Sequence, residues 1–347
     1  MIAPVRTSMV LESLHSTAKS RSLWTDHVGH SKQLRAKLLT IEKELFKNLQ
    51  APSEPQILYE ASIHPIRSGG KRLRPLLTLL ACEAVGGNFQ KALPVATAIE
   101  LIHTASLIHD DLIDEDRERR GAPTVHTKYG RNVAVLSVDL LTAKAMQIIS
   151  ENSPAKIRRI VAEACIEMCE GEYMDMAFKK SPEAVTEEEY LKMVRKKTGA
   201  LVKAAAECGA ITGGGNTREI KSLSRYGEFL GLSLQLRDDV QEFLTAKLCP
   251  TVSVSNSLVS QGSNLVLIHS FRNSDRSLQS FLRRLVTSNT DRSGLRAALD
   301  VFESSMSIQH VQRMSERFER EARNAILGMH FHNQRILEDL AKFVSRY

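Results

Sequence analysis

The sequence is poor in the residues that cross-link small folds or interrupt helices. It has five cysteines in 347 residues, an odd number, and none of them forms a Cys-x-x-Cys pair. This spacing argues against a disulfide framework and against a zinc site. Glycine (18), proline (10) and aromatic residues (5%) are also scarce, whereas leucine, alanine, glutamate, lysine and arginine are abundant. Such a composition is typical of long helices.

Long apolar runs are also missing. No stretch approaches the roughly 18 apolar residues that a membrane-spanning helix needs, so we expect no membrane span and a cytoplasmic protein. Residues 1–24 are rich in serine and mildly basic, as organelle transit peptides are, but Glu12 and the lack of a clear cleavage pattern weaken that alternative. We interpret 1–26 as an N-terminal extension and 27–347 as one domain.

The charge balance excludes little. Lysine and arginine (47) exceed aspartate and glutamate (40), for a net charge of +7. That excess is compatible with anionic small molecules, membrane surfaces or nucleic acid. Because the sequence lacks a basic face interleaved with aromatic residues and any recognisable nucleic-acid motif, we expect no nucleic-acid partner.

Apolar residues recur three and four positions apart along most of the chain, which predicts helices. Joints such as RRGAP and NSPAK, with glycine, proline or serine, separate the helical stretches. Several stretches are apolar around most of their circumference, so we expect an all-α fold, one helical bundle with a buried central helix pair. The predicted helices cover 34–49, 73–85, 92–115, 134–150, 156–178, 186–211 and 218–246, and helical spacing resumes near Leu265.

Carboxylates gather in the stretch LIHDDLIDEDRERRG, residues 107–121. On a helix, Asp110 and Asp114 lie one turn apart with Asp111 beside them, so three carboxylates converge. At a helix C-terminus these anions face the negative end of the helix dipole, and a cation should offset the repulsion. Oxygen ligands of this kind suit Mg²⁺ together with substrate phosphates. For one such motif alone, a solvated acidic surface is the alternative.

The acidic pattern recurs in LQLRDDVQE, where Asp238, Asp239 and Glu242 have the same spacing at the end of another apolar stretch. Two acidic faces in one bundle can oppose each other across a cavity, with metal ions bridging a diphosphate between them. The recurrence therefore favours a metal site over a solvated surface.

Cationic side chains that can hold a second anion are also present. The stretch GGKRLRP supplies Lys71, Arg72 and Arg74 after two glycines, and Arg119 and Arg120 follow the first acidic motif. Arginine suits phosphate oxygens, and glycine lets backbone amides approach them.

Five motifs, GGKRLRP, LIHDDLIDEDRERRG, CEGEYMD, RKKTGAL and LSLQLRDDVQE, occur in the order found in the trans-type (E)-polyprenyl diphosphate synthases. The sequence resembles this family over residues 30–247 and, more loosely, in its C-terminal helices. The resemblance implies the isoprenoid synthase fold, a helical bundle around a central apolar cavity. It also implies a Mg²⁺-dependent prenyltransferase that joins isopentenyl diphosphate to an allylic prenyl diphosphate, and a homodimer, with a heteromer as the alternative.

The resemblance assigns roles to individual residues. The implied metal ligands are Asp110, Asp111, Asp114, Asp238, Asp239 and Glu242. The residues implied to hold isopentenyl diphosphate are Lys71, Arg74, His103 and Arg120. Lys197 and Arg119 match residues that hold the allylic diphosphate, Asp175 matches a further acid, and Thr198 and Gln235 match groups that place oxygen dipoles near the allylic cation. His103 has separate support, because it lies two helical turns before Asp110 on the same face.

The implied reaction is metal-assisted ionisation of the allylic carbon–oxygen bond, attack by the isopentenyl double bond and loss of a proton to the departing diphosphate. An apolar interior would keep water from the cation. Ala105 and Ser106 lie five and four residues before Asp110, where the resemblance implies that a bulky side chain limits chain growth. Their small size predicts a product of C20 or longer, unless a deeper floor exists at Ile99, Ile102, Thr142 or Met146. The alternative is that they are small only to admit a neighbouring helix.

Four departures from the family pattern stand out. Glu242 replaces aspartate, Glu172 replaces glutamine, and Ala122 replaces a common lysine. The segment 248–264, LCPTVSVSNSLVSQGSN, has lost the charged residues of a loop that adds contacts on the side of the second acidic motif. We therefore expect slow turnover, and a second hypothesis stays open: a non-catalytic or regulatory subunit of a heteromeric prenyl diphosphate synthase.

Overall fold

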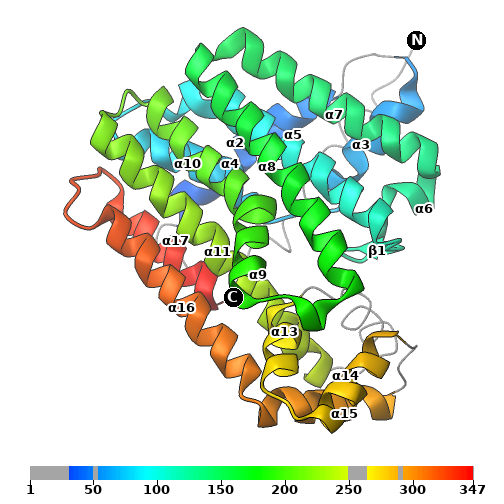
Figure 1. Cartoon of the computed structure of the whole chain (residues 1–347). Coiled ribbons are helices and arrows are strands. Elements are labelled where there is room, and N and C mark those ends of the chain that lie inside the picture. The colour runs from blue at the N-terminus through cyan, green and yellow to red at the C-terminus, as the bar shows by residue number, and fades with distance from the viewer. Residues whose placement is uncertain (1–30, 50–53, 249–263, 288–291, 347) are drawn as a thin grey trace. The chain divides into compact units, whose positions relative to one another are not determined.

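The computed structural model of the chain describes residues 31–49, 54–248, 264–287 and 292–346 (Figure 1). The described chain forms two compact units. The first holds the described residues of 31–162, Ala204–Leu223 and Met329–Phe343, and the second holds those of Glu163–Lys203, 224–328 and 344–346. Within the described residues, one hairpin of two-residue strands is the only sheet, so the predicted all-α class is confirmed.

Helix α5 (Phe89–Ile113) is the central element of the first unit. It packs most extensively on α4 and α7, and also contacts α2, α3 and α6. The Asn88 side chain caps its start by accepting from the Gln90 amide at 3.0 Å, and the Asp114 amide closes its last turn on the Asp110 carbonyl. The helices around it are α2 (Ser31–Leu49), α3 (Gln56–Arg67), α4 (Leu73–Ala84), α6 (Val125–Tyr129) and α7 (Arg131–Asn152).

A buried arginine connects three parts of the first unit. Arg72 is 4% exposed, has a left-handed backbone (φ 50°) and precedes α4. Its guanidinium donates to Glu100 Oε1 of α5 at 3.0 Å and lies 3.7 Å from Glu42 Oε1 of α2. It also donates to the carbonyls of Ile66 and Gly69, at 2.6 and 3.2 Å. Buried charges need such partners, because their desolvation is otherwise uncompensated.

A short hairpin follows α5. Strand β1 (Glu118–Arg119) pairs antiparallel with β2 (Ala122–Pro123), with Glu118 opposite Pro123 and Arg119 opposite Ala122. The two residues between them, Arg120 and Gly121, both have positive φ (57° and 73°), as tight hairpin turns require. The hairpin thus fixes the directions of the two arginines that the sequence analysis singled out.

The second unit is built around α13 (Leu265–Arg272), which packs on α16, α15, α14 and α9. These neighbours are α16 (Ser307–Ile326), α15 (Arg292–Ser304), α14 (Arg276–Thr287) and α9 (Glu187–Val194). The apolar core of the second unit includes Tyr190 and Phe271. It also includes Phe243 and Phe302, whose rings pack edge to face with centroids 4.8 Å apart. A short 3₁₀ turn, η1 (Pro182–Ala184), precedes α9.

Four further helices have residues in both units: α8 (Ala155–Lys180), α10 (Ala200–Thr212), α11 (Thr217–Leu248) and α17 (Gln334–Arg346). Between α9 and α10, residues Arg195–Gly199 form a π-helical turn, η2. The single helix predicted for 186–211 is therefore interrupted at RKKTG. The other predicted helices are present, whereas α3 and α6 were not predicted.

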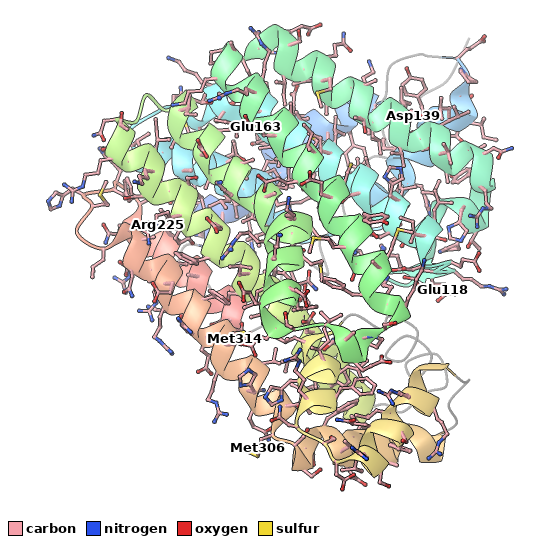
Figure 2. All side chains as sticks on the ribbon, in the orientation of Figure 1. Glu118, Asp139, Glu163, Arg225, Met306 and Met314 are labelled. Atoms are coloured by element: carbon pink, nitrogen blue, oxygen red, sulfur yellow. The ribbon has the colours of Figure 1, made fainter. Side chains whose placement is uncertain are left out.

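Two helices, α5 and α7, are long and apolar enough to cross a membrane by length and composition alone. In α5, 72% of the apolar window is buried within the protein, as in a core helix, whereas in α7 only 39% is buried. Val135, Leu136 and Met146 of α7 are exposed by 37–53%, and Asp139, labelled in Figure 2, is exposed among them. The described chain thus leaves an apolar surface on α7.

Replacing the buried arginine tests its structural importance. Arg72→Met is expected to lower the free energy of unfolding by about 3–5 kcal/mol, because Glu42 and Glu100 stay buried without the guanidinium that they share. Urea unfolding followed by circular dichroism measures the loss. Arg67→Met, at an exposed arginine of α3, is the matched control and should cost less than about 1 kcal/mol. Equal losses in the two variants would contradict the assigned role.

Candidate active site

The glycine pair before α4, Gly69 and Gly70, packs closely against the guanidinium of Arg120. Arg120 donates to the carbonyl of Gly69, which also accepts from Arg72. Gly70 has φ +142°, and a Cβ added there would lie 2.7 Å from Arg120 Nη1 and 2.8 Å from Arg72 Nη1. Although Arg120 is exposed as a residue, its guanidinium end is desolvated here, and that desolvation, aided by Arg72, lowers its pKa to about 10. Arg120 is still a cation at neutral pH.

His103 lies among arginines on the inner part of α5. Arg74 Nη1 donates to His103 Nε2 at 3.1 Å, and because a guanidinium can only donate, the proton of the neutral ring is on Nδ1. Burial lowers the pKa of His103 well below 6.5, and the charges of Arg74, Arg120, Arg72 and Arg119 lower it further. The neutral ring therefore offers an N–H donor amid four cations. Lys71, also predicted for this site, is exposed in the preceding loop.

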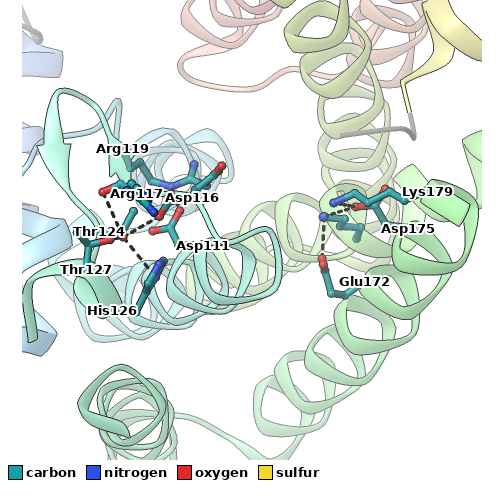
Figure 3. A network of polar contacts seen from close by, with 11 residues as sticks. Asp111, Asp116, Arg117, Arg119, Thr124, His126, Thr127, Glu172, Asp175 and Lys179 are labelled. Atoms are coloured by element: carbon teal, nitrogen blue, oxygen red, sulfur yellow. Dashed lines mark hydrogen bonds and ion pairs between the residues drawn. The ribbon is translucent and has the colours of Figure 1, made fainter. Parts of the chain in front are cut away.

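The three aspartates at the end of α5 differ in their surroundings. Asp110 and Asp114 are partly exposed, whereas Asp111 is only 4% exposed. Arg119 Nε donates to Asp111 Oδ1 at 2.6 Å (Figure 3). Burial raises the pKa of Asp111, and the charge of Arg119 opposes that rise. Asp111 is thus engaged in orienting Arg119.

Asp110 and Asp114 have the chemistry of a divalent-cation site. Their carboxylates offer hard oxygen ligands and lie one helical turn apart on one face of α5. They lie at its C-terminal end, where the helix dipole is negative. Among the described residues, no group of three His, Cys, Asp or Glu side chains is arranged to hold a metal by protein ligands alone. A cation here would need substrate oxygens or water as further ligands, as Mg²⁺ commonly does.

Residues that the sequence analysis did not single out hold the hairpin in place. Thr124 Oγ1 donates to the Asp116 carbonyl at 2.8 Å and lies 2.9 Å from Thr127 Oγ1 (Figure 3). His64 Nε2 donates to the Pro123 carbonyl at 2.8 Å, across 59 residues of sequence. The Thr124 contacts are local, whereas the role of His64 depends on a contact between distant segments that no sequence pattern could have indicated.

In the second unit, Lys197 is paired with two carboxylates. Its Nζ lies 2.7 Å from Glu172 Oε2 and 2.7 Å from Asp175 Oδ2, and Lys179 Nζ lies 3.5 Å from the same Asp175 oxygen (Figure 3). A Cβ on Gly171 would lie 2.3 Å from the Lys197 backbone nitrogen. Glycine therefore lets α8 and the π-helical turn approach closely, and Glu172 becomes a direct partner of Lys197.

The second acidic motif belongs to a hydrogen-bonded chain. Thr198 Oγ1 donates to Gln235 Oε1 at 2.8 Å, and Gln235 Nε2 donates to Asp239 Oδ1 at 3.1 Å. Asp239 is 4% exposed, whereas Asp238 beside it is exposed. The side chain of Glu242 lies outside the described residues. The structure thus brings Thr198, Gln235 and Asp239 together, and leaves the metal-ligand assignments as predictions.

The segment that departs most from the family pattern, 248–264, lies outside the described residues except at its two ends. Asn264 is 5% exposed, caps α13 by accepting from the Val266 amide at 2.9 Å, and donates to the Asp239 carbonyl at 3.2 Å. No role was predicted for Asn264 from its position in the sequence. An asparagine before an apolar helical run is a capping signal that could have identified it.

The residues expected to limit product length lie on α5. Ala105 is 4% exposed, and Ser106 is partly exposed with its hydroxyl donating to the His103 carbonyl at 2.9 Å. Of the residues considered for a deeper floor, Ile99 and Ile102 are buried, whereas Met146 is 37% exposed. Thr142 is partly exposed. The position of the floor stays a prediction.

Comparison with known proteins places the chain among isoprenoid enzymes. The Polyprenyl synthetase family model matches residues 55–302. The chain is 37% identical over 279 residues to the short chain isoprenyl diphosphate synthase of Methanothermobacter thermautotrophicus, covering 76% of this chain and 85% of that protein.

Solved structures of isoprenoid enzymes have a fold similar to that of this chain. Geranylgeranyl pyrophosphate synthetase from Pyrococcus horikoshii matches with a TM-score of 0.81 and 34% identity, covering 91% of this chain and 98% of that one. Polyprenyl synthase from Caulobacter crescentus, in complex with calcium and isoprenyl diphosphate, matches with a TM-score of 0.84 and 26% identity, covering 93% and 98%. The predicted isoprenoid synthase fold is thereby confirmed.

The half-buried, neutral His103 predicts an acid-sensitive contribution to stability. Below pH 6.5, His103 becomes protonated in the unfolded chain but stays neutral in the folded protein. The free energy of unfolding therefore decreases as the pH is lowered from 6.5 to the lowered pKa of the folded state. The slope is at most about 1.4 kcal/mol per pH unit. Urea unfolding at pH 7.5 and 5.5 should show a smaller acid loss in His103→Gln than in the wild type. His109→Gln, at an exposed position of α5, should keep the wild-type loss; an unaltered loss in His103→Gln would contradict the prediction.

Proposed function

The chain belongs to the polyprenyl synthetase family of prenyltransferases, and on that premise we propose that it condenses isopentenyl diphosphate with an allylic prenyl diphosphate in a Mg²⁺-dependent reaction. The product is a trans-polyprenyl diphosphate of C20 or longer. The observation that carries the proposal is the hydrogen bond from Arg74 to the neutral His103, which lies two helical turns before the aspartates of α5, together with Arg120 on the Gly69 carbonyl of the loop before α4. Such a grouping attracts a multiply charged anion and places it near carboxylates that can share a cation with it.

The cationic residues of the first unit bind the diphosphate of isopentenyl diphosphate. Arg74 and Arg120 supply charge-assisted donors, and His103 supplies its Nδ1–H. Because His103 is neutral and accepts from Arg74, it orients that guanidinium without adding a charge. Lys71, exposed in the loop before α4, adds a cation that can reach the diphosphate from solvent.

The acidic end of α5 holds the divalent cation on the allylic diphosphate. Asp110 and Asp114 are the favoured ligands, because their side chains are partly exposed. Asp111 accepts from Arg119 and keeps that guanidinium directed at the same diphosphate. Bound Mg²⁺ supplies Lewis-acid assistance to the breaking carbon–oxygen bond. The Caulobacter relative, which was solved with calcium and isoprenyl diphosphate, supports a divalent cation and a diphosphate in this family.

We also assign roles to one cation and a pair of dipoles in the second unit. Lys197 binds the allylic diphosphate, and its two carboxylate partners, Glu172 and Asp175, hold the ammonium in place beforehand. Thr198 and Gln235 present oxygen dipoles to the developing allylic cation. Of the two aspartates of the second motif, Asp238 is exposed and Asp239 is buried, so we assign a metal ion to Asp238.

The exposed apolar face of α7 supports a homodimer. Val135, Leu136 and Met146 form a surface that a soluble monomer would leave in contact with water. We propose that a second copy covers it, and light scattering should then give twice the molar mass of the chain; a monomer at micromolar concentration would contradict this.

Removing one aspartate tests both the reaction and its metal dependence. With Mg²⁺, labelled isopentenyl diphosphate and primers of C5 to C20, the wild type should form extended products, and a chelator should abolish them. Asp110→Ala should lower kcat/KM at least about 100-fold, because a metal ligand is lost. Glu115→Ala, at an exposed acid of the same stretch, is the control and should leave turnover unchanged.

The outcome also separates the two functional hypotheses. If no primer is extended by the chain alone and activity arises only when a second synthase chain is added, the chain is a regulatory subunit and the proposed catalytic function is wrong.

A second substitution tests the residue proposed to leave the growing chain room. Ala105→Phe places a ring at a buried position of α5, one turn and a half before Asp110, and should shorten the main product by at least one five-carbon unit. Chromatography of the dephosphorylated products measures the length distribution. Ile166→Phe, at a 60% exposed position of α8, should leave it unchanged. The same distribution in Ala105→Phe as in the wild type would place the floor elsewhere.

A further inference from the structure

A buried tyrosine outside the motifs contacts the second acidic motif. Tyr190 lies on α9, seven residues before Lys197, and is 1% exposed. Its hydroxyl donates to Asp239 Oδ2 at 2.6 Å, a short bond to a carboxylate. Because a carboxylate can only accept, the direction of this bond is fixed.

The other oxygen of Asp239 fixes a chain of hydrogen bonds. Oδ1 accepts from Gln235 Nε2, so the amide must turn its oxygen the other way, toward Thr198. Thr198 Oγ1 therefore has to donate to Gln235 Oε1, at 2.8 Å. With its proton engaged in this bond, the threonine oxygen has only lone pairs left to present elsewhere. The Asp239 carboxylate thus determines, through two hydrogen bonds, in which direction the Thr198 hydroxyl donates its proton.

Asp239 is also held from a third element. The Leu265 amide at the start of α13 lies 3.4 Å from Asp239 Oδ2, and the Asn264 side chain donates to the Asp239 carbonyl. The carboxylate is therefore fixed by α9, by α11 and by the first turn of α13. The Tyr190 hydroxyl, at 2.6 Å, is closer to the carboxylate than the Gln235 side-chain nitrogen at 3.1 Å and the Leu265 amide at 3.4 Å.

We propose that Tyr190 is a positioning residue that acts through Asp239. It holds the Asp239 carboxylate in the orientation that aligns Gln235 and makes the Thr198 oxygen the negative end of a dipole for the allylic cation. This inference rests on the proposed prenyltransferase function. Without the phenol hydroxyl, Asp239 can rotate, Gln235 is no longer held and the Thr198 hydroxyl can turn its proton toward the cation.

Removal of one hydroxyl tests the proposal. Tyr190→Phe should lower kcat about tenfold, the effect of losing about 1.4 kcal/mol of transition-state stabilisation, while KM for both substrates stays within about twofold of the wild type. Tyr173→Phe, at a tyrosine that is 73% exposed, is the matched control and should leave kcat unchanged. A higher KM with unchanged kcat would overturn the proposal, because the hydroxyl would then serve substrate binding.

A double-mutant cycle separates positioning from a general structural role. In an Asp239→Asn background, Tyr190→Phe should lower kcat less than about twofold, since the group through which it acts has already been changed. An equal tenfold loss in both backgrounds would overturn the proposal.

One readout does not depend on activity. In protein labelled with ¹⁵N-glutamine, Tyr190→Phe should speed solvent exchange of the Gln235 side-chain amide at least about threefold, because Asp239 holds it less firmly. Unchanged exchange would overturn the positioning role even if kcat falls. An inactive wild type would overturn the proposed function, whereas faster exchange in the variant would still support the link from Tyr190 to Gln235.

Discussion

The buried charge of Arg72 is the constraint on which the first unit depends. A guanidinium out of water is tolerated only if its donors are satisfied and its charge is balanced. Glu42 of α2 and Glu100 of α5 balance it, and the Gly69 carbonyl accepts from it. The same carbonyl accepts from Arg120, so the arrangement that satisfies the buried arginine also seats a surface arginine of the candidate site. Structure and function share one set of contacts here.

In both acidic motifs the two adjacent aspartates differ in exposure and in their partners in the same way. In each, the first aspartate is the more exposed, Asp110 in one and Asp238 in the other, and the second is buried and bonded to protein donors. Asp111 accepts from Arg119, and Asp239 accepts from tyrosine and glutamine. A buried carboxylate needs such donors, and each donor is thereby oriented in turn. The second aspartate thus arranges the groups around it.

Parts of the candidate site were predictable because they lie on one helix. His103, Asp110 and Asp114 follow each other at helical spacing. The glycines before the cationic run were predicted to let backbone amides approach phosphate oxygens, whereas the close neighbours of Gly70 in the structure are the guanidiniums of Arg120 and Arg72. The partners of Lys197 were not predictable, since Glu172 comes from another helix. The sequence showed a glutamate in place of a glutamine, and only the fold shows that it lies 2.7 Å from the lysine ammonium.

Local periodicity by itself determined the helical class, the positions of most helices and the presence of two acidic motifs, because apolar spacing and carboxylate spacing are properties of neighbouring residues. The tertiary structure decided what each charged side chain meets. It made Arg72 a buried structural ion, when the sequence grouped it with ligand-binding cations, and it turned the RKKTG stretch into a π-helical turn. It also brought Tyr190 to Asp239 across 49 residues. Desolvation and partner choice depend on contacts between distant segments, and these arise only when the chain folds.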